Sequence, residues 1–279
     1  MTSFLKSTFI ALFPVLGLAV SLFSLFTLFD QGFDINTLGR FISGSTIAFF
    51  FIGLFIISQP RTSANLTVFS LLIGLGTLLG LDLNIDALYV TLLSILLGVG
   101  WALYLFWYSK FNTRDSPVLE KGKRIPSFQL EDTAGKNLSN EQFLGAPTIY
   151  LFYRGNWCPL CMAQIQEIAN QYKEIEAKGA QVVFISPQPH KQTETLAKKF
   201  DLGFHYLQDT DNQVAKKLGI LSEAGIPLGF QILGYASETV MPTVVITDAK
   251  GIIHFVDLTD NYRVRPEPET FLEVIDAMA

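Results

Sequence analysis

The residues of this chain that could most readily do chemistry are its two cysteines, Cys158 and Cys161, which stand three positions apart. Two thiols one helical turn apart can close and reopen a disulfide, and a thiol with a lowered pKa is a nucleophile. A structural zinc ion would need two further Cys or His ligands, but His190, His205 and His254 are scattered without ligand spacing. The pattern predicts thiol chemistry with no metal and no cofactor, and two inert core cysteines are the alternative.

The elements that flank the pair place it at a junction between a strand and a helix. Residues 148–153 form an apolar, β-branched and aromatic run, and residues 158–178 have apolar positions at helical spacing. Cys158 would stand at or just before the first helical turn, where unpaired N–H groups and the helix dipole favour an anion. Pro159 suits the first helical position. We therefore expect Cys158 to be the accessible nucleophile with a lowered pKa, and Cys161 to be the more buried resolving thiol.

The remainder of the second half alternates strands with helices and then ends in a hairpin and a helix. This order predicts a central sheet that is covered on both faces. The hairpin is marked by the turn signal Asp-Ala-Lys-Gly at 248–251. The predicted elements are a strand at 181–186, helices at 193–200 and 212–218, hairpin strands at 244–247 and 252–256, and a closing helix at 268–278.

The first 110 residues are far more apolar than the rest. The chain has 20 Lys and Arg and 25 Asp and Glu, of which only seven precede Lys110. A helix needs roughly 20 residues to cross a ~30 Å hydrocarbon core, a length that the third apolar run does not reach. We predict an α-helical transmembrane bundle of about four spans at 1–110, a polar linker at 111–123 and a separate α/β domain at 124–279. The uncharged apolar runs are 8–29, 41–58, 66–81 and 87–109.

The apolar half lacks the residues on which transport and electron relay depend. No Asp, Glu, Lys, Arg or His lies inside an apolar run, and this half holds no cysteine. Proton pumping and a thiol relay across the bilayer are therefore excluded. We expect these helices to anchor the chain in the lipid bilayer, with binding of a lipid or quinone as an open alternative. A net charge of −5 without a basic stripe excludes nucleic acid as a partner.

Charges in the short loops predict on which side of the membrane the α/β domain lies. Lys and Arg collect in cytoplasmic loops, and seven basic residues lie on one side against Arg40 and four aspartates on the other. We therefore predict a multi-pass protein of the inner or plasma membrane, in which an even number of spans places both termini and the α/β domain in the cytoplasm. An odd number of spans would place the α/β domain on the opposite side of the membrane. The seven are Lys6, Arg61, Lys110, Arg114, Lys121, Lys123 and Arg124, and the aspartates are Asp30, Asp34, Asp82 and Asp86.

Two segments of the second half resemble a known family. They are Tyr-Arg-Gly-Asn-Trp-Cys-Pro-Leu-Cys at 153–161 and Tyr-Arg-Val-Arg-Pro-Glu-Pro-Glu at 262–269. Both are similar to the peroxiredoxin-like branch of the thioredoxin superfamily, close to the alkyl hydroperoxide reductase and thiol-specific antioxidant group. The resemblance covers about 124–278 and implies a thioredoxin-like α/β fold with Cys158 and Cys161 as the catalytic residues.

The resemblance also implies roles for residues outside the cysteine pair. Met-Pro-Thr at 241–243 is similar to the superfamily's cis-proline site, which faces the active cysteines. Pro242 and Thr243, together with Trp157 beside the thiols, would then bind substrate. One of three arginines would stabilise the thiolate, namely Arg154, Arg263 or Arg265.

Two positions depart from the family's pattern. Peroxiredoxins carry Thr or Ser three residues before the reactive cysteine and Pro seven residues before it, where this chain has Gly155 and Leu151. In this respect the Cys-Pro-Leu-Cys pair is more similar to the dithiol exchangers, such as glutaredoxins.

These observations predict a membrane-anchored thiol–disulfide oxidoreductase with peroxiredoxin-like antioxidant activity, which reduces disulfides or hydroperoxides. A thioredoxin- or glutathione-type reductant would restore its dithiol. One alternative is a thiol–disulfide protein that faces the periplasm and serves the maturation of exported proteins. Another is a membrane redox sensor without turnover.

Overall fold

The computed structural model describes residues 2–82, 84, 87–111, 114 and 116–278. Asp86, which contributed to the predicted loop charges, lies outside the described residues. The chain divides into two compact units. The helical unit comprises residues 1–58 and 62–110, and the α/β unit comprises residues 59–61 and 111–279.

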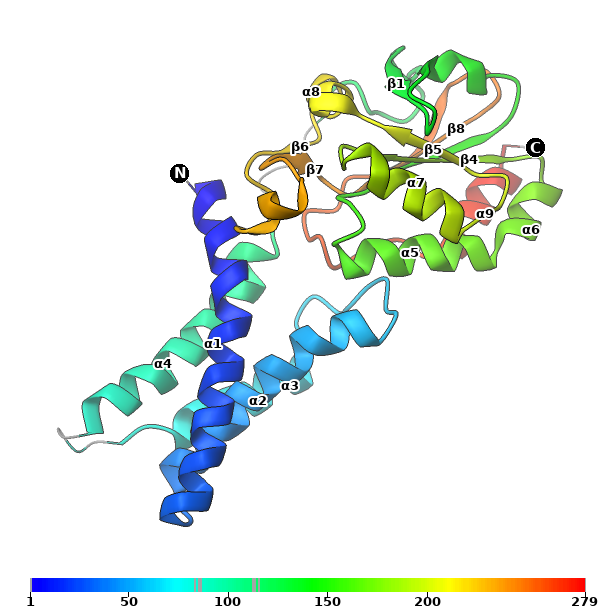
Figure 1. Cartoon of the computed structure of the whole chain (residues 1–279). Helices are drawn as coiled ribbons and strands as arrows, with labels where there is room; N and C mark the ends of the chain where they lie inside the picture. The colour runs from blue at the N-terminus through cyan, green and yellow to red at the C-terminus, as the bar shows by residue number, and fades with distance from the viewer. Residues whose placement is uncertain (1, 83, 85–86, 112–113, 115, 279) are drawn as a thin grey trace. The chain divides into compact units, whose positions relative to one another are not determined.

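The helical unit contains four apolar helices where four apolar runs were predicted (Figure 1). Three of them are long and apolar enough to cross a membrane. The third, α3, has only 13 residues, which at ~1.5 Å per residue is about 20 Å, short of a ~30 Å hydrocarbon core. The helices are α1 (Thr2–Gln31), α2 (Ile35–Ile56), α3 (Thr67–Leu79) and α4 (Leu88–Leu103), and a π-helical turn, η2 (Tyr104–Tyr108), extends α4.

Glycines and aromatic rings hold this unit together. A Cβ atom at Gly39 of α2 would lie 2.7 Å from the carbonyl oxygen of Gly76 in α3, so the two helices pack with their backbones close together. Phe50 packs edge-on against Trp101 and Tyr104, with ring centroids 5.3 and 5.6 Å apart. The core of the helical unit is thus aromatic.

The second helix begins before its predicted apolar run. The run 41–58 contains no charged residue, but α2 begins at Ile35 and therefore also includes Arg40, whose side chain is buried. The helix begins earlier than the apolar run because Asp34 caps it, its carboxylate accepting from the Thr37 N–H at 2.7 Å. The Arg40 guanidinium donates to Thr37 Oγ1 at 2.8 Å.

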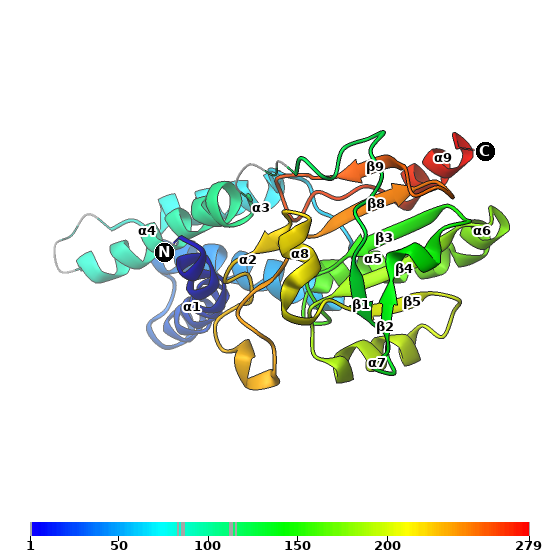
Figure 2. The same ribbon diagram turned by 90° about the horizontal axis from the view of Figure 1, so that it is seen from above.

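The α/β unit is built on a seven-stranded sheet in the order β2-β1-β5-β4-β3-β8-β9 (Figure 2). At its centre β3, β4 and β5 run parallel, β8 pairs antiparallel with β3, and β9 pairs antiparallel with β8. This arrangement, with helices on both faces, is the predicted thioredoxin-like α/β fold. The strands are β1 (Gln129–Glu131), β2 (Asn137–Ser139), β3 (Thr148–Phe152), β4 (Gln181–Ser186), β5 (His205–Gln208), β8 (Thr243–Thr247) and β9 (Ile253–Asp257).

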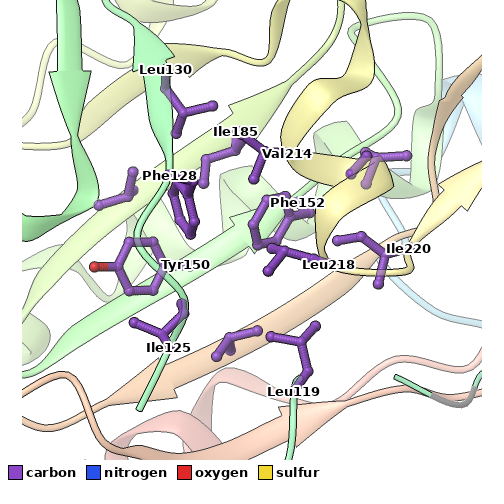
Figure 3. Packing of buried hydrophobic residues seen from close by; sticks show 14 of the residues in the cluster. Leu119, Ile125, Phe128, Leu130, Tyr150, Phe152, Ile185, Val214, Leu218 and Ile220 are labelled. Atoms are coloured by element: carbon purple, nitrogen blue, oxygen red, sulfur yellow. The ribbon is translucent and has the colours of Figure 1, made fainter. Parts of the chain in front are cut away.

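Helices cover both faces of this sheet, with α5 and α8 on opposite sides (Figure 1). Tyr150 and Phe152 of β3 join the core cluster beneath α8, which contributes Val214 (Figure 3). The alternate residues Ile149 and Leu151 point to the other face and are also buried, as expected for a strand covered on both sides. The helical elements are η3 (Asn140–Phe143), α5 (Pro159–Asn170), α6 (Tyr172–Ala177), α7 (His190–Lys199), η4 (Thr210–Asn212), α8 (Gln213–Lys217), η5 (Phe230–Leu233) and α9 (Pro268–Asp276).

The segment predicted as a polar linker, 111–123, packs against the α/β unit. Leu119 is 2% exposed and belongs to the core cluster. Ser116 Oγ donates to the carbonyl oxygen of Leu218 at 2.6 Å, and the Gly122 N–H donates to that of Ile253 at 2.7 Å. The α/β unit therefore begins close to the end of the last apolar helix.

A small two-stranded sheet lies outside the main one. Its strands, β6 (Leu221–Ser222) and β7 (Thr239–Val240), pair antiparallel. They close the base of a loop at 223–238 that contains η5. This loop was not predicted, and it touches the active-site segment described below.

Candidate active site

The cysteines lie where the sequence placed them, at the junction of β3 and α5. The Tyr153 N–H donates to the carbonyl oxygen of Ile185 at 2.9 Å, which continues the pairing of β3 with β4 for one more residue. Cys158 is the N-cap of α5, with extended backbone angles, and Pro159 is the first helical residue. The first hydrogen bond of the helix runs from the Met162 N–H to the carbonyl oxygen of Cys158 at 3.0 Å.

The guanidinium of Arg265 lies against both thiols. Its Nη2 atom is 3.4 Å from Cys161 Sγ and 4.0 Å from Cys158 Sγ. Its other donors are fixed, since Nη1 donates to Gln164 Oε1 at 2.8 Å and Nε donates to the carbonyl oxygen of Tyr262 at 3.1 Å. Arg265, one of the three candidate arginines, therefore faces the sulfur atoms of both cysteines.

The expected order of the two thiol pKa values is wrong. Burial raises the pKa of Cys158 well above its ordinary value, and its hydrogen bond and charge coupling with Cys161 add to the rise. Burial also acts to raise the pKa of Cys161, but the hydrogen bond from Cys158, the charge of Arg265 and a backbone hydrogen bond from Arg154 lower it to about 5. The reason is geometric, because the buried cation lies closer to Cys161 than to the sulfur at the helix mouth.

Accessibility also differs from expectation. Cys158 is 2% exposed and Cys161 is fully buried, so the order of exposure is as predicted but neither sulfur is open to solvent. Two buried thiols that share one cation titrate as a pair, in which the first proton leaves near neutral or acidic pH and the second is retained. The resting dithiol therefore carries one negative charge beside Arg265.

Trp157, which precedes Cys158 in the chain, packs against an arginine and a phenylalanine. The Arg154 guanidinium stacks on the Trp157 ring at 4.7 Å, and Phe230 of the 223–238 loop packs edge-on against the same ring at 5.7 Å. Arg154 also donates to the carbonyl oxygen of Gly225 in that loop. Trp157, Arg154 and Phe230 thus form an aromatic and cationic cluster, called the cover below, which joins the active-site segment to the 223–238 loop.

Gly155 explains one departure from the family's pattern. Its φ of +141° is a conformation that favours glycine, and a Cβ atom there would lie 2.8 Å from the Trp157 ring. A Thr or Ser side chain cannot occupy this position without displacing Trp157. The chain therefore places no side-chain hydroxyl at the position where peroxiredoxins carry one.

A buried glutamine, which sequence reasoning missed, anchors the active-site segment. Gln188 follows β4, and its Oε1 atom accepts from the Asn156 N–H at 2.8 Å. Its Nε2 atom donates to Tyr153 Oη at 2.9 Å, and Asn156 Nδ2 donates to the carbonyl oxygen of Gln192 at 2.8 Å. These bonds tie the residues before Cys158 to the loop that precedes α7 and to the first turn of α7.

The sequence left open the isomer of the peptide bond before Pro242. The Met241–Pro242 peptide bond is trans, as are the other peptide bonds in the described part of the chain. Thr243 pairs with Phe152 at the end of β3, so this segment does lie beside the strand that leads to the cysteines. Arg114, which sequence reasoning also missed, donates to the carbonyl oxygen of Pro242 at 2.9 Å and to Thr243 Oγ1. The polar groups assigned to substrate binding are thus bonded to an arginine.

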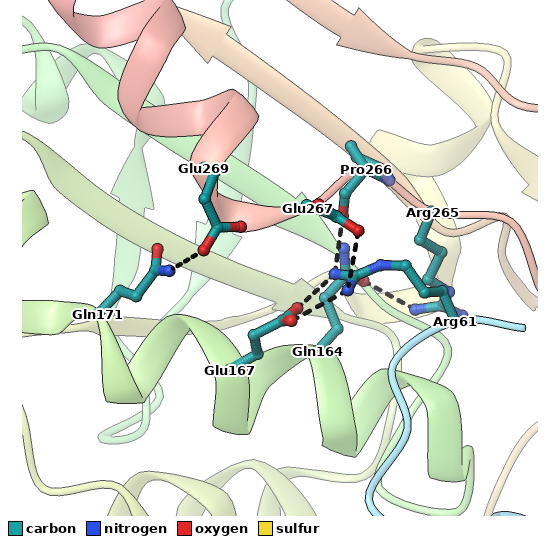
Figure 4. Close-up of polar contacts among 8 residues, drawn as sticks. All are labelled: Arg61, Gln164, Glu167, Gln171, Arg265, Pro266, Glu267 and Glu269. Carbon is teal, nitrogen blue, oxygen red and sulfur yellow. Dashed lines mark hydrogen bonds and ion pairs between the residues drawn. The ribbon is translucent and has the colours of Figure 1, made fainter.

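Two polar side chains on α5, Gln164 and Glu167, bond to Arg265 and to Arg61 respectively (Figure 4). Gln164 is buried, stands one turn after Cys161 and holds Arg265. Glu167, three residues further along, accepts from Arg61 Nη1 at 3.0 Å, and Arg61 also donates to the carbonyl oxygen of Pro266 at 3.2 Å. Helical spacing could have identified Gln164 as a neighbour of Cys161, but its partner lies 101 residues away in sequence.

Comparison with known proteins gives consistent matches to the α/β unit. A family model described as the AhpC/TSA family matches residues 121–256. Among curated relatives, the chloroplastic peroxiredoxin Q of Populus jackii is 35% identical over 102 residues, which cover 37% of this chain and 48% of the relative. The putative peroxiredoxin bcp of Haemophilus influenzae is 30% identical over 105 residues, covering 38% of this chain and 68% of the relative.

A third relative is named as a thiol-disulfide oxidoreductase and not as a peroxiredoxin. The thiol-disulfide oxidoreductase ResA of Bacillus subtilis is 29% identical over 164 residues, which cover 58% of this chain and 86% of the relative. The chain spans about half to two thirds of the length of the first curated relatives that it matches. The residues matched by the family model, 121–256, lie within the α/β unit.

Proposed function

Because the chain belongs to the AhpC/TSA family, we propose that it is a membrane-anchored thiol–disulfide oxidoreductase whose working groups are Cys158 and Cys161. The observation that carries this proposal is the position of Arg265, a buried cation within 4.0 Å of both sulfur atoms. A structural pair of core cysteines needs no such cation, because burying a charge is costly unless that charge is compensated. A cation beside a thiol favours the thiolate, which is the reactive form.

The arrangement supports the following division of labour. In the resting dithiol the two sulfur atoms are hydrogen-bonded and share one proton and one negative charge beside Arg265. Cys158 is the outer of the two sulfur atoms, so it is the one that substrate reaches. Because Arg265 lies within 4.0 Å of both sulfur atoms, it can stabilise the negative charge on Cys158 during the attack while the shared proton lies on Cys161.

The electron balance is that of dithiol exchange. With a disulfide substrate, Cys158 Sγ forms a mixed disulfide and releases one thiolate, and Cys161 Sγ then attacks Cys158 Sγ and releases the second. With a hydroperoxide, Cys158 becomes a sulfenic acid as the O–O bond breaks and the alcohol, or water from hydrogen peroxide, leaves; attack by Cys161 on Cys158 Sγ then releases hydroxide. Either route leaves a Cys158–Cys161 disulfide, and a thioredoxin- or glutathione-type dithiol or thiol supplies the two electrons that reopen it.

We propose disulfides as the preferred substrate class, and hydroperoxides as the second. The conformation of Gly155 supports this order, because that position carries no hydroxyl group that could orient a peroxide. Trp157 remains the proposed substrate-contacting residue, since its ring lies beside the cysteine segment and is only partly buried. Pro242 and Thr243 remain proposed contacts through their place beside the end of β3.

The membrane anchoring is proposed from the three long apolar helices. The loop charges support a cytoplasmic α/β unit if α3 also spans, which requires tilt or local thinning of the bilayer. The shortness of α3 is a specific observation that favours the alternative, an odd number of spans with the α/β unit on the opposite side. There it would exchange disulfides with exported proteins.

Catalytic turnover of a disulfide or hydroperoxide would distinguish an oxidoreductase on either side of the membrane from a redox sensor. The full chain in detergent should reduce insulin disulfides when supplied with a thiol reductant, and hydrogen peroxide more slowly. Cys158→Ser should abolish both activities, because no outer nucleophile remains. Full activity of Cys158→Ser, or no turnover of either substrate by the parent chain, would contradict the proposal.

A further inference from the structure

The 223–238 loop carries the most exposed large apolar side chains of the α/β unit. Ile232 is 90% exposed, Leu233 59% and Leu228 45%, whereas no other large apolar side chain among the described residues of this unit exceeds 37%. Residues 224–237 also contain no charged side chain. Protein surfaces usually scatter such residues singly, so their concentration on one loop indicates contact with something apolar.

The loop has a defined structure. β6 and β7 close its base, and the short turn η5 carries its outer end. Gly229 and Gly234 flank that turn with φ values of +99° and +87°, which glycine adopts at little cost. Ile226 and Tyr235 are buried, so the apolar residues of the loop divide into an inner set that packs on the unit and an outer set that does not.

We propose that the outer set, Leu228, Ile232 and Leu233, inserts into the lipid interface of the membrane in which the chain is anchored. This inference rests on the anchoring proposed above. Only residues 109–110 separate the end of η2 from Phe111, which belongs to the α/β unit. The Phe111 N–H donates to the carbonyl oxygen of Asp260 in the same unit. An anchored α/β unit therefore stays close to lipid.

The chemistry of the outer set favours lipid over a protein partner. It consists of aliphatic side chains without a neighbouring charge, which suits the boundary between headgroups and acyl chains. Protein interfaces are instead marked by Arg and aromatic side chains with hydrogen-bonding groups. The flanking Glu223 and Glu238 stand at the base of the loop, so the docking we propose relies on apolar insertion and not on attraction to anionic headgroups.

Docking of the loop has a consequence for the active site. Phe230 lies in the same turn as Ile232 and packs against Trp157, and Arg154 bonds to Gly225 at the start of the loop. Insertion of the outer set would hold this cover in place and turn the Cys158 end of α5 towards the membrane surface. Substrates would then reach the thiols from the membrane interface.

The test uses the full chain in nanodiscs, with both native cysteines replaced by serine so that one introduced cysteine carries a nitroxide label. The test position is Ile232→Cys. The matched control is Lys250→Cys, an exposed position in the turn between β8 and β9. Phe26→Cys, on α1 and 66% exposed, reports on the anchoring alone. Each label is measured for collisions with oxygen, which partitions into lipid, and with a water-soluble nickel chelate.

The label at 232 should show a several-fold higher ratio of oxygen to nickel collisions than the label at 250. Equal ratios at 232 and 250, with the label at 26 in lipid, would overturn the docking proposal and leave the anchoring intact. Shielding of the label at 232 from both reagents would also overturn it, because a protein partner or a second copy would then cover the loop. A label at 26 that collides freely with nickel would overturn the anchoring itself.

Discussion

Replacing Arg265 with glutamine should raise the lower pKa of the cysteine pair by about 2 to 3 units. The guanidinium stands 3.4 Å from Cys161 Sγ, and two unit charges at that separation attract by roughly 5 kcal/mol at an effective dielectric constant of about 20. At about 1.36 kcal/mol per pKa unit, this energy corresponds to roughly 3.6 units. Relaxation around the shorter side chain offsets part of this loss of attraction. The pKa should therefore rise from about 5 to about 7 or 8, and not by the full amount.

The same substitution should make the disulfide harder to reduce. A thiolate stabilised below pH 7 stabilises the reduced protein. Raising its pKa from about 5 to about 7 removes roughly 2.3 kcal/mol of that stabilisation at neutral pH, which lowers the reduction potential by about 50 mV. Arg265→Lys keeps the charge and should produce a much smaller change in both quantities.

The assay follows iodoacetamide alkylation and thiolate absorbance of the full chain across pH, together with equilibration against glutathione buffers. Circular dichroism establishes that each variant is folded. An unchanged pKa near 5 and an unchanged potential in a folded Arg265→Gln protein would refute the reasoning. The stabilisation of the thiolate would then have to come from the hydrogen bonds of Cys158 and the Arg154 backbone.

Three further predictions concern stability and topology. Leu119→Ala should destabilise the α/β unit by about 2–5 kcal/mol, because it leaves a cavity in the core. Leu144→Ala, at a 37% exposed position, should have little effect. The dependence of thiol alkylation on denaturant concentration measures the stability of both variants. The reduced chain should gain melting temperature from pH 5 to pH 8 relative to the oxidised chain, because the Cys161 pKa of about 5 lies below the ordinary thiol value of about 8.5, so the unfolded state binds more protons in this range. The gain is lost as pH falls through about 5, and equal pH profiles for the two redox states would contradict it. A fluorescent reporter fused after Ala279 should fluoresce and an alkaline phosphatase fusion should stay inactive if the α/β unit is cytoplasmic, and the opposite result would mean an odd number of spans.

Local sequence signals were sufficient for the elements that carry the cysteines. The β-branched run at 148–153 and the helical spacing after Cys158 predicted β3 and α5 closely, because both are set by side chains near in sequence. The helix was predicted to continue to 178, but it breaks at Gln171 between α5 and α6. The four apolar runs likewise predicted four helices, and the third run was already too short to reach the spanning length.

The electrostatics of the site could not be predicted in the same way. The sequence offered three arginines as partners for a thiolate, and the choice of Arg265 depends on a contact across 104 residues. The order of the pKa values followed from that contact and from burial, which overrode the helix N-terminus. The anchoring role of Gln188 and the cover formed by the 223–238 loop are likewise long-range contacts without a local motif.

The central claim, that Cys158 attacks substrate and Cys161 resolves the intermediate, is tested most directly with Cys161→Ser. This variant of the full chain, incubated with a disulfide substrate, should accumulate a stable mixed disulfide, and mass spectrometry should locate the adduct on Cys158. The parent chain should pass through the same adduct without accumulating it and end as the Cys158–Cys161 disulfide. A Cys161→Ser chain that forms no adduct, or a Cys158→Ser chain that forms one rapidly on Cys161, would contradict the account.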